Sequence, residues 1–473
     1  MMKKKMLFVY PNMNTELRIP LAISILSACV RRAGHDFKLF DTTFSVERME
    51  TDDEKMAEMG THLPTNLAEM VGGLKKVDIT HELLGLIGDF QPDVVAVSLL
   101  ERNILTAERL CGLIKSRFPD IIILAGGIMP TIAPEFVLKK DWVDYICVGE
   151  GEEALVDFMD SLSDKASLSK ISNIWSKGKG GLVIKTHSRP LLDLNNVPDQ
   201  DWQDFDLRHL LKPFMGKVYR GGSFEFSRGC LKMCSFCVAP KLREIQGGGK
   251  YHRTKSPSKI ISEIESKVKN YGLNMLSFGD TDFLSGVPTE IIKEFLELYI
   301  KRVGIPFTIQ CGAETLTDES ILALLRKACC CAISVGVESG SARVRQKIIH
   351  KYVSKEVIKR GFVLCRKHEL RITANYMIGV PFETEEDVWE SIRFNREIDP
   401  PSIAVTYFTP FVGTELYEIS VREGFYNPLH IATNNYSESP LIMPQLSGQR
   451  IHELIKVFVS DFKTYQKDFN IIS

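Results

Sequence analysis

Long apolar runs are missing from this 473-residue sequence. No stretch approaches the roughly 20 apolar residues that a membrane-spanning helix needs, which argues against a transmembrane segment. The first residues, MMKKKMLFVYPN, have a basic start, but their apolar run is too short for a secretory signal peptide and is typical of a first strand. The sequence therefore predicts a cytoplasmic protein.

An excess of charge of either sign is also missing. The 59 Lys and Arg residues balance 60 Asp and Glu residues, which leaves a formal net charge of −1. This balance gives no electrostatic reason to expect a nucleic acid as partner. The composition, with 44% apolar and 25% charged residues, is that of a globular protein, and the length predicts two or three domains.

Eight of the eleven cysteines are scattered and lie in apolar, periodic contexts, which predicts buried core thiols in a reducing compartment. The run Cys329-Cys330-Cys331 joins a helical pattern to a strand pattern. Because consecutive strand residues point to opposite faces, these three thiols cannot readily bind one metal. The other scattered cysteines are Cys29, Cys111, Cys147, Cys311 and Cys365.

Two regions of the sequence each show repeated alternation of strand and helix patterns. This arrangement predicts an α/β fold with two main domains. The first is a doubly wound, Rossmann-like domain over residues 1–163. Ser, Lys, Gly and Pro clusters then indicate a linker with some local hairpin structure over 164–221. From Ser223 six strand–helix units predict a partial parallel barrel over 222–420, whose strands are SFEFS, MLSFGD, FTIQC, AISVGVE, ANYMIGV and SIAVTYF. A loop and one amphipathic helix form a helical tail over 421–473.

Three clustered cysteines follow the first barrel strand, in FSRGCLKMCSFC (226–237). A zinc site would need a fourth ligand nearby, usually from a second Cys or His pair, and His252 stands alone. Three thiolates can instead hold a cluster of four irons and four sulfides and leave one iron free for another ligand. The end of a barrel strand is also where such sites are built.

FSRGCLKMCSFC resembles the signature of the radical S-adenosylmethionine (SAM) family, with its C-x3-C-x2-C spacing and Phe236 before the last cysteine. The resemblance implies that Cys230, Cys234 and Cys237 bind a [4Fe–4S] cluster whose fourth iron holds the amino and carboxylate groups of SAM. It also implies an electron donor such as flavodoxin or ferredoxin, and reductive cleavage of SAM to the 5′-deoxyadenosyl radical.

Later strand ends match the same family. Asp280 and Asp282, in FGDTDF, stand where the family receives the amino group of SAM, although either could equally be a turn or cap aspartate. Glu338 and Ser339, in VGVESGS, resemble the ribose-binding stretch, and Gly379, in YMIGVPFET, resembles the stretch near the adenine. Phe236 completes the residues that we expect to bind SAM.

One arginine that the family often carries after the third barrel strand is missing. Gly312, in QCGAETL, stands in its place. A contact to a carboxylate of substrate or cofactor is therefore lost or supplied elsewhere. Arg343 and Lys351 are possible substitutes, although both are more often ordinary charges on a helix surface.

The first domain resembles the cobalamin-binding domain of cobalamin-dependent radical SAM enzymes. The resemblance rests on four strand ends taken in order, YPNMNTE (10–16), SLLERN (98–103), AGGIMPT (125–131) and VGEGEEAL (148–155). Ligands of doubly wound folds bind at this edge, and paired glycines let a ligand approach the backbone closely. The residues expected to contact cobalamin are Ser98, Leu100, Gly126, Gly127 and Gly149.

The Asp-x-His-x-x-Gly motif, which supplies a histidine to cobalt in the mutase type of cobalamin domain, is missing. His35 precedes the second strand and so lies at the wrong end of it. We therefore expect cobalamin without a protein histidine on its lower face. The methylthiotransferase type, which modifies transfer RNA, fits less well, because Cys29, Cys111 and Cys147 do not resemble a second cluster motif and the tail is helical.

The resemblance implies methylation of an unactivated carbon of a small molecule, lipid or peptide, with a phosphinate phosphorus as the less favoured acceptor. The deoxyadenosyl radical would take a hydrogen atom from the substrate, which would then take a methyl group carried by cobalamin. A rearrangement or oxidative cyclisation with the same cofactors is the first alternative. A non-catalytic module that binds zinc or a cluster is the alternative from another class.

Overall fold

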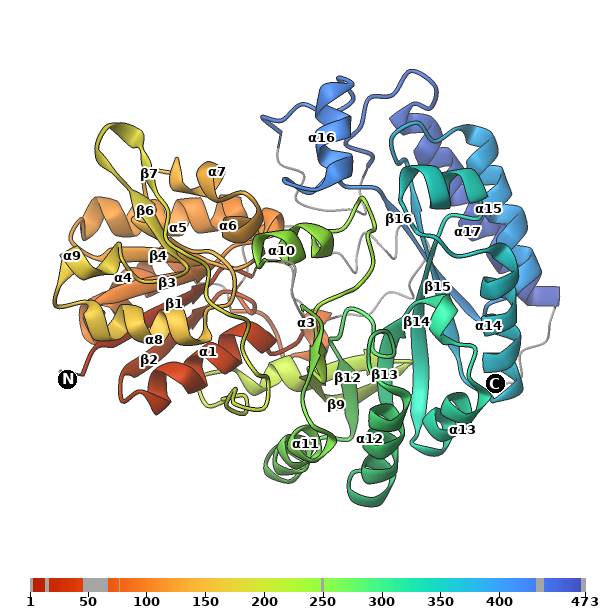
Figure 1. Cartoon of the computed structure of the whole chain (residues 1–473), viewed down its shortest axis with the longest axis horizontal. Helices are drawn as coiled ribbons and strands as arrows, with labels where there is room; N and C mark the ends of the chain where they lie inside the picture. The colour runs from red at the N-terminus through yellow and green to blue at the C-terminus, as the bar shows by residue number, and fades with distance from the viewer. Residues whose placement is uncertain are drawn as a thin grey trace. The chain divides into compact units, whose positions relative to one another are not determined.

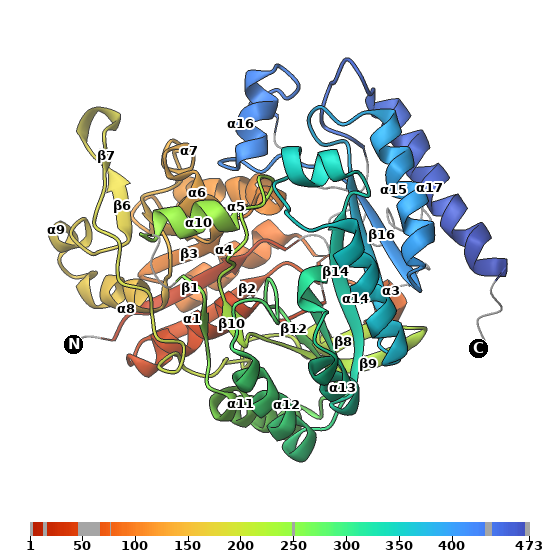
Figure 2. The same ribbon diagram turned by 45° about the vertical axis from the view of Figure 1, so that its right-hand side comes forward.

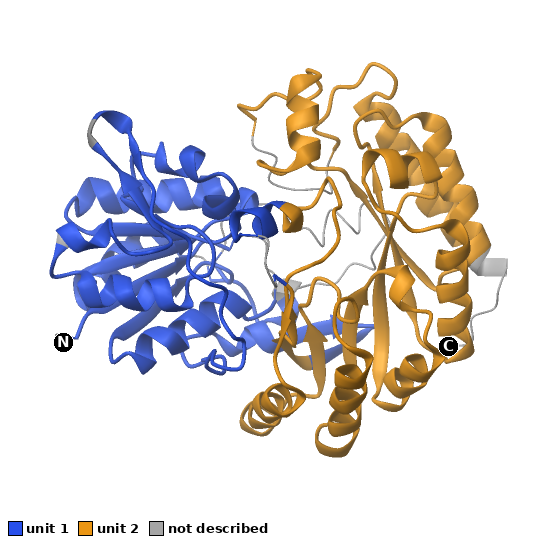
Figure 3. Ribbon diagram, in the orientation of Figure 1, with its two compact units in different colours: residues 1–50, 66–219, 241–251 blue, residues 51–65, 220–240, 252–473 orange. Residues whose placement is uncertain are grey.

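The computed structural model describes residues 3–12, 17–45, 67–75, 77–247, 251–430 and 438–468. The chain divides into two compact units, shown in Figure 3. One comprises residues 1–50, 66–219 and 241–251, and the other comprises residues 51–65, 220–240 and 252–473. Within the described ranges, no helix has both the length and the apolar character needed to cross a membrane.

The first unit is built on a parallel sheet with the strand order β2-β1-β3-β4-β5 (Figure 1). Val94, Val95 and Val97 of β3 are at most 1% exposed, as expected where helices cover both faces of a sheet. Helices α1 and α8 contact each other, as do α4 and α5. This is the predicted doubly wound fold. Its strands are β1 (Lys5–Tyr10), β2 (Asp36–Asp41), β3 (Val94–Ser98), β4 (Ile122–Gly126) and β5 (Tyr145–Cys147), and its helices are α1 (Leu21–Arg32), α3 (Leu67–Met70), α4 (Ile79–Phe90), α5 (Ile104–Arg117), α6 (Ile128–Ile132), α7 (Pro134–Leu138), α8 (Glu152–Ser161) and α9 (Lys165–Leu168).

The segment predicted as a linker, 164–221, contributes strands to both sheets. Strands β6 (Ile174–Lys177) and β7 (Val183–Ile184) form an antiparallel hairpin, and β6 pairs with β5. Strand β8 (Leu211–Phe214) lies beside β9 in the second sheet. The hairpin that the sequence predicts therefore extends the first sheet, while the division of the chain at residues 163, 221 and 420 stays a prediction.

The second unit holds six parallel strands that curl into a half-barrel, with helices on the outer face (Figure 2). The fold class is confirmed, and five of the six strands match the predicted segments, whereas the first strand begins at Lys217 and ends at Phe224, within the predicted segment SFEFS. Asp318, Ser354 and Thr384 accept backbone N–H bonds at the starts of α13, α14 and α15, as their residue types favour. The strands are β9 (Lys217–Phe224), β12 (Met275–Phe278), β13 (Phe307–Cys311), β14 (Cys330–Glu338), β15 (Ile372–Ile378) and β16 (Ser402–Tyr407); the helices are α11 (Pro257–Tyr271), α12 (Thr289–Arg302), α13 (Glu319–Lys327), α14 (Lys355–Lys367) and α15 (Glu385–Ile398).

The C-terminal part adds helices α16 (Glu415–Arg422) and α17 (Gly448–Asp468) to this unit. Helix α17 packs against α15 and β16, and its Ile451, Leu454 and Phe458 are buried. The Phe458 ring lies 4.8 Å from the ring of Tyr376 on β15. The predicted amphipathic helix is therefore part of the barrel wall.

Candidate active site

The three clustered cysteines line one cavity of about 260 Å³ at the carboxyl end of the barrel strands. Cys230 and Cys234 are each 7% exposed, and Cys237 is half-buried. Among the described residues, no group of three or more His, Cys, Asp and Glu side chains is placed to hold a single metal ion. Three thiols that share a cavity can each bind a different iron of a four-iron cluster, which leaves the fourth iron for another ligand.

Burial sets the protonation of Cys234 and Cys237. It raises the pKa of Cys234 to about 11, because desolvation outweighs the nearby lysine charges of Lys351 and Lys232. Burial likewise raises the pKa of Cys237. Both thiols are therefore protonated at neutral pH until metal binds, and binding of a cluster must release protons.

Ser235 fixes the cysteine loop from two directions. Its N–H donates to the Ile349 carbonyl at 3.1 Å and its hydroxyl donates to the Ile348 carbonyl at 2.7 Å. The Leu416 N–H, at the start of α16, donates to the Ser235 carbonyl at 3.0 Å. The residue between Cys234 and Phe236 is thus held by segments that follow β14 and β16.

Of the three consecutive cysteines, Cys330 is the buried core thiol that the sequence predicts, whereas Cys329 and Cys331 are half-buried. Cys330 is 1% exposed, and burial raises its pKa well above the usual value. The Cys331 thiol donates to the Phe307 carbonyl at 3.2 Å, within the sheet. These residues stand at the start of β14, so they are packing residues at the opposite end of the strand from the cavity.

Asp282 lies in the cavity and is only 3% exposed. Its carboxylate accepts from the Lys232 ammonium at 2.7 Å, the Gly312 N–H at 3.0 Å and the Ser285 N–H at 3.1 Å. Lys232 also reaches Glu314 at 2.6 Å. Although burial lowers the pKa of Lys232, the two carboxylates outweigh it and raise that pKa, so the lysine is charged.

Glu338 lies in the same cavity, at the end of β14, and pairs with Lys351 at 3.0 Å. Its backbone adopts a φ of +65°, which a non-glycine residue rarely does. A Cβ atom on Gly336 would overlap with the Glu338 carboxylate and would lie 2.8 Å from the Lys351 ammonium. Glycine at 336 therefore makes room for this ion pair.

Polar side chains of the strands form the rest of the cavity wall. Asn375 on β15 donates to the Ser334 hydroxyl on β14 at 2.8 Å, and Gln310 on β13 donates to the Asp280 carbonyl at 2.7 Å. Sequence reasoning missed these residues, although the alternation of polar and apolar residues in AISVGVE and ANYMIGV indicates which side chains share a face.

Three residues predicted to contact SAM lie outside the cavity lining. Asp280 is 1% exposed; its carboxylate accepts from the Phe226 N–H at 3.1 Å and the Ser227 hydroxyl at 2.6 Å, and burial raises its pKa to about 7. Ser339 lies 3.2 Å, hydroxyl to hydroxyl, from Ser391. Gly379 has a φ of +90° and donates its N–H to Glu383. Phe236, Asp282 and Glu338 do line the cavity.

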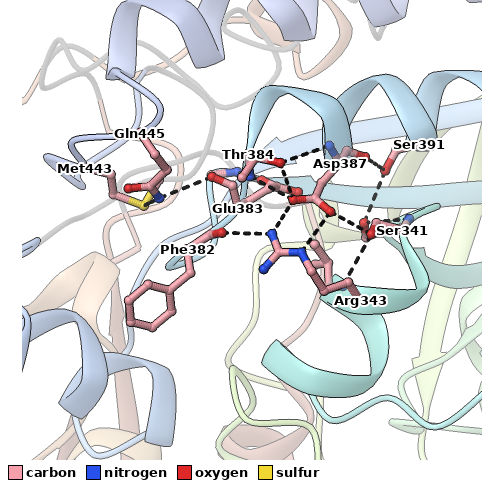
Figure 4. A network of polar contacts seen from close by, with 12 residues as sticks. Ser341, Arg343, Phe382, Glu383, Thr384, Asp387, Ser391, Met443 and Gln445 are labelled. Carbon is pink, nitrogen blue, oxygen red and sulfur yellow. Dashed lines mark hydrogen bonds and ion pairs between the residues drawn. The ribbon is translucent and has the colours of Figure 1, made fainter.

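Figure 4 shows why Arg343 does not substitute for the missing arginine. Its guanidinium pairs with Asp387 and donates to the Phe382 carbonyl, outside the cavity. Asp387 also accepts from Ser341 at 2.7 Å and from the Thr384 N–H at 2.9 Å, which closes the capping box of α15. Of the two predicted substitutes, only Lys351 lines the cavity.

The same figure shows Glu383, which is fully buried in this network. Burial raises its pKa to about 8. One carboxyl oxygen accepts from Gly379, and Gln445 donates to the Glu383 carbonyl at 3.2 Å. A protonated glutamic acid thus supports the turn that follows β15.

The carboxyl edge of the first sheet presents backbone and small side chains. Ser98 and Gly126 are neighbours in register on β3 and β4. Gly127 is exposed and has a φ of +103°, and a Cβ atom there would lie 3.1 Å from the Leu99 carbonyl. The Leu100 N–H donates to the Asn103 side chain at 2.9 Å. Such an edge fits a large ligand that lies against backbone.

Thr131, which sequence reasoning missed, connects two of the predicted loops. Its hydroxyl donates to the Gly127 carbonyl at 2.8 Å and accepts from the Gly149 N–H at 3.0 Å. The side chain is 2% exposed. The loops after β4 and β5 are therefore tied together. Of the strand end at 10–16, residues 13–16 lie outside the described residues.

Two buried histidines lie at opposite ends of this sheet. His35 is 4% exposed and bonds Asp160 at 3.0 Å, and its other ring nitrogen accepts from the Lys4 N–H at 3.3 Å. It therefore lies at the amino end of the strands, as predicted. His209 is 1% exposed and bonds Asp41, at the carboxyl end of β2, at 2.6 Å. Nothing in its local sequence, DLRHLL, indicates that contact.

Comparison with known families places both domains. Residues 224–394 match the radical SAM superfamily, and residues 71–159 match the B12 binding domain. Both matches fall where the sequence predicts the cluster barrel and the cobalamin domain.

Curated relatives are distant in sequence. The anaerobic magnesium-protoporphyrin IX monomethyl ester cyclase of Rubrivivax gelatinosus is 28% identical over 70% of this chain and 59% of its own length. This chain thus spans about three fifths of that relative. The cytidylyl-2-hydroxyethylphosphonate methyltransferase of Streptomyces wedmorensis is 24% identical over 95% of this chain and 88% of its own.

Among solved structures, the radical SAM methyltransferase TsrM from Kitasatospora setae, with cobalamin and a [4Fe–4S] cluster bound, shares the fold with a TM-score of 0.69. The superposition covers 98% of this chain and 89% of that one at 18% identity.

Proposed function

Since the chain belongs to the radical SAM superfamily and carries a B12-binding domain, we propose that it methylates an unactivated carbon of a small molecule, lipid or peptide. Its cofactors are a [4Fe–4S] cluster, SAM and cobalamin. When bound, they supply an adenosyl radical that removes a hydrogen atom and a methyl group that replaces it. One observation carries the proposal. Cys230, Cys234 and Cys237 line the same cavity as two acid–lysine pairs, in a chain that also has a B12-binding domain.

The chain's own residues bind and orient these groups. We assign cluster ligation to Cys230, Cys234 and Cys237, and SAM binding to Phe236, Asp282 and Glu338, which line the cavity. Asp282 suits an ammonium group and Glu338 suits a ribose diol, because carboxylates accept hydrogen bonds from both. Asp280, Ser339 and Gly379 then shape the strand ends behind the cavity through the bonds described above.

For cobalamin we assign Ser98, Leu100, Gly126, Gly127 and Gly149. They follow β3, β4 and β5 at the edge where doubly wound sheets bind ligands, and Gly127 leaves the backbone open to contact. Thr131 holds two of these loops in place. We also infer a small one-electron reductant, such as flavodoxin or ferredoxin, as partner.

The relatives support two reactions. The phosphonate methyltransferase matches nearly the whole chain, which favours methyl transfer. The cyclase matches a smaller share of both chains, so oxidative cyclisation is the second candidate. The two reactions differ in their products from SAM, because methyl transfer consumes a second SAM and yields S-adenosylhomocysteine.

Isotopic labelling tests the proposal without knowledge of the substrate. Anaerobically reconstituted protein would be incubated with hydroxocobalamin, a reductant and SAM that carries a trideuterated methyl group. If the protein transfers methyl groups, S-adenosylhomocysteine should form, and cobalamin should gain the mass of one trideuterated methyl group. Formation of 5′-deoxyadenosine with neither of these products would reject methyl transfer in favour of cyclisation. Zinc in place of iron and sulfide in the purified protein would reject both reactions.

A further inference from the structure

The position of the Lys232 ammonium depends on the absence of a side chain at Gly312. A Cβ atom on residue 312 would overlap with the Lys232 ammonium and would lie 2.6 Å from both carboxylate oxygens of Glu314. No side chain can therefore stand at 312 while Lys232 keeps its position. The space beside residue 312, where the family resemblance predicts an arginine, is occupied by a lysine from the cysteine loop.

Two carboxylates hold Lys232, but they do not accept all three of its N–H donors. An ammonium group has three donors, and the described residues accept two, through Asp282 at 2.7 Å and Glu314 at 2.6 Å. The side chain is 22% exposed and lines the cavity with the three cysteines. One N–H is thus available to a ligand that enters beside the cluster thiolates.

Neighbouring charges match an α-amino acid group. Lys232 can donate to a carboxylate, and Asp282, which lines the cavity beside it, can accept from an ammonium. The second cavity lysine, Lys351, also has two acceptors, Glu338 and the Gly336 carbonyl, but its carboxylate partner is Glu338 and not Asp282. Lys232 is therefore the cavity cation that stands next to the acceptor for the amino group.

We propose that Lys232 binds the carboxylate of the methionyl part of SAM, and that the absence of a side chain at Gly312 leaves room for the Lys232 ammonium. This inference rests on the proposed function only in that SAM is the ligand of the cavity. It does not depend on whether methyl transfer or cyclisation follows. A plain alternative is that Lys232 only neutralises Asp282 and Glu314, which would make it important for the cavity but indifferent to the carboxylate of SAM.

Decarboxylated SAM separates the two roles. Dissociation constants for SAM and for decarboxylated SAM would be measured anaerobically, by calorimetry, on protein with an oxidised cluster. The wild-type chain is expected to prefer SAM. Lys232→Met is expected to bind SAM about 10- to 100-fold more weakly, the range for one hydrogen bond to a charged group, and to bind the decarboxylated analogue as before. The preference would then fall by that factor, and the part that remains would come from the bond between the carboxylate and the fourth iron.

Lys351→Met is the matched control, since it removes the other lysine of the same cavity. It is expected to weaken both ligands alike and so to keep the preference. The double variant Lys232→Met/Gly312→Arg is expected to regain the preference, because the arginine enters the space that the lysine leaves. Gly312→Arg alone is expected to bind SAM more weakly than the wild-type chain, because the arginine side chain and Lys232 cannot occupy the same space.

Iron and sulfide content, measured on every variant, ensures that the cluster is intact. If Lys232→Met lost its cluster, Lys232→Arg and the double variant would carry the test, both with the preference retained. Equal weakening of both ligands by Lys232→Met would overturn the inference and leave the lysine as a neutralising group. Failure of the wild-type chain to bind SAM at all would overturn the proposed function itself.

Discussion

The carboxyl edges of the two sheets differ in what they offer a ligand. The half-barrel presents charged side chains, with Asp282 and Glu338 each paired to a lysine beside the cluster cysteines. The first sheet presents glycines and backbone groups, with Thr131 as an internal tie. Charged pairs select a small ligand by its ionic groups, whereas open backbone accommodates the surface of a large one. Variants can separate these two modes.

Loss of a loop cysteine should have the largest effect. Cys234→Ala removes one of three thiolates, so we expect near-complete loss of iron and sulfide, measured by chemical analysis and by the visible absorption of the cluster. Cobalamin content should stay at the wild-type level. Cys331→Ala is the control and should keep its iron; loss of iron in that variant would contradict the assignment of Cys331 to packing.

Gly336→Ala should abolish much of the SAM binding while it spares the cluster. The added methyl group would displace the Glu338 carboxylate and crowd the Lys351 ammonium. We expect SAM affinity, measured by calorimetry, to fall about 10- to 100-fold, as for loss of a charged hydrogen bond. Gly112→Ala, in α5 with no atom near its added methyl group, should leave SAM affinity unchanged.

Gly127→Ala probes the other edge. Gly127 has a φ of +103° and a ψ of −165°, which is almost exclusive to glycine, so alanine there costs on the order of 1–3 kcal/mol of backbone strain, and its methyl group would press on the Leu99 carbonyl at 3.1 Å. We expect cobalamin affinity, measured by absorbance titration, to fall roughly 10-fold. Iron content and SAM affinity should not change. A parallel loss of iron would mean that the substitution damages the fold rather than the cobalamin edge.

The smallest effect on bound cofactors is expected from Glu383→Gln, which instead changes stability. The folded pKa of about 8 lies above the ordinary value of 4.5, so between these pH values the folded chain holds a proton that the unfolded chain has lost. Stability from this group is complete below pH 4.5 and is lost as pH rises towards 8, with a slope of about 1.4 kcal/mol per pH unit at most. Denaturant unfolding of Glu383→Gln should lack this slope. An unchanged slope would assign it to other groups.

The fold was predictable because strand periodicity survives in sequence, and all six barrel strands and the cluster motif are local patterns. The cavity was predictable only in part. The sequence alone does not distinguish Asp280 from Asp282. The turn after β12 directs Asp280 to β10 (Ser227–Arg228) and Asp282 to the cavity. Lys232, Gly336 and Thr131 were not predicted, because their roles depend on where side chains point, and sequence spacing does not specify that direction.

The Ser235 contacts impose an order on the maturation of the protein. The cysteines are translated early, but the Ile348 carbonyl that holds their loop lies 113 residues further along the chain, and Leu416 later still. A ribosome-bound chain therefore displays its thiols long before the loop can take its final shape. The final shape of the cysteine loop therefore requires the chain through Leu416, at the start of α16.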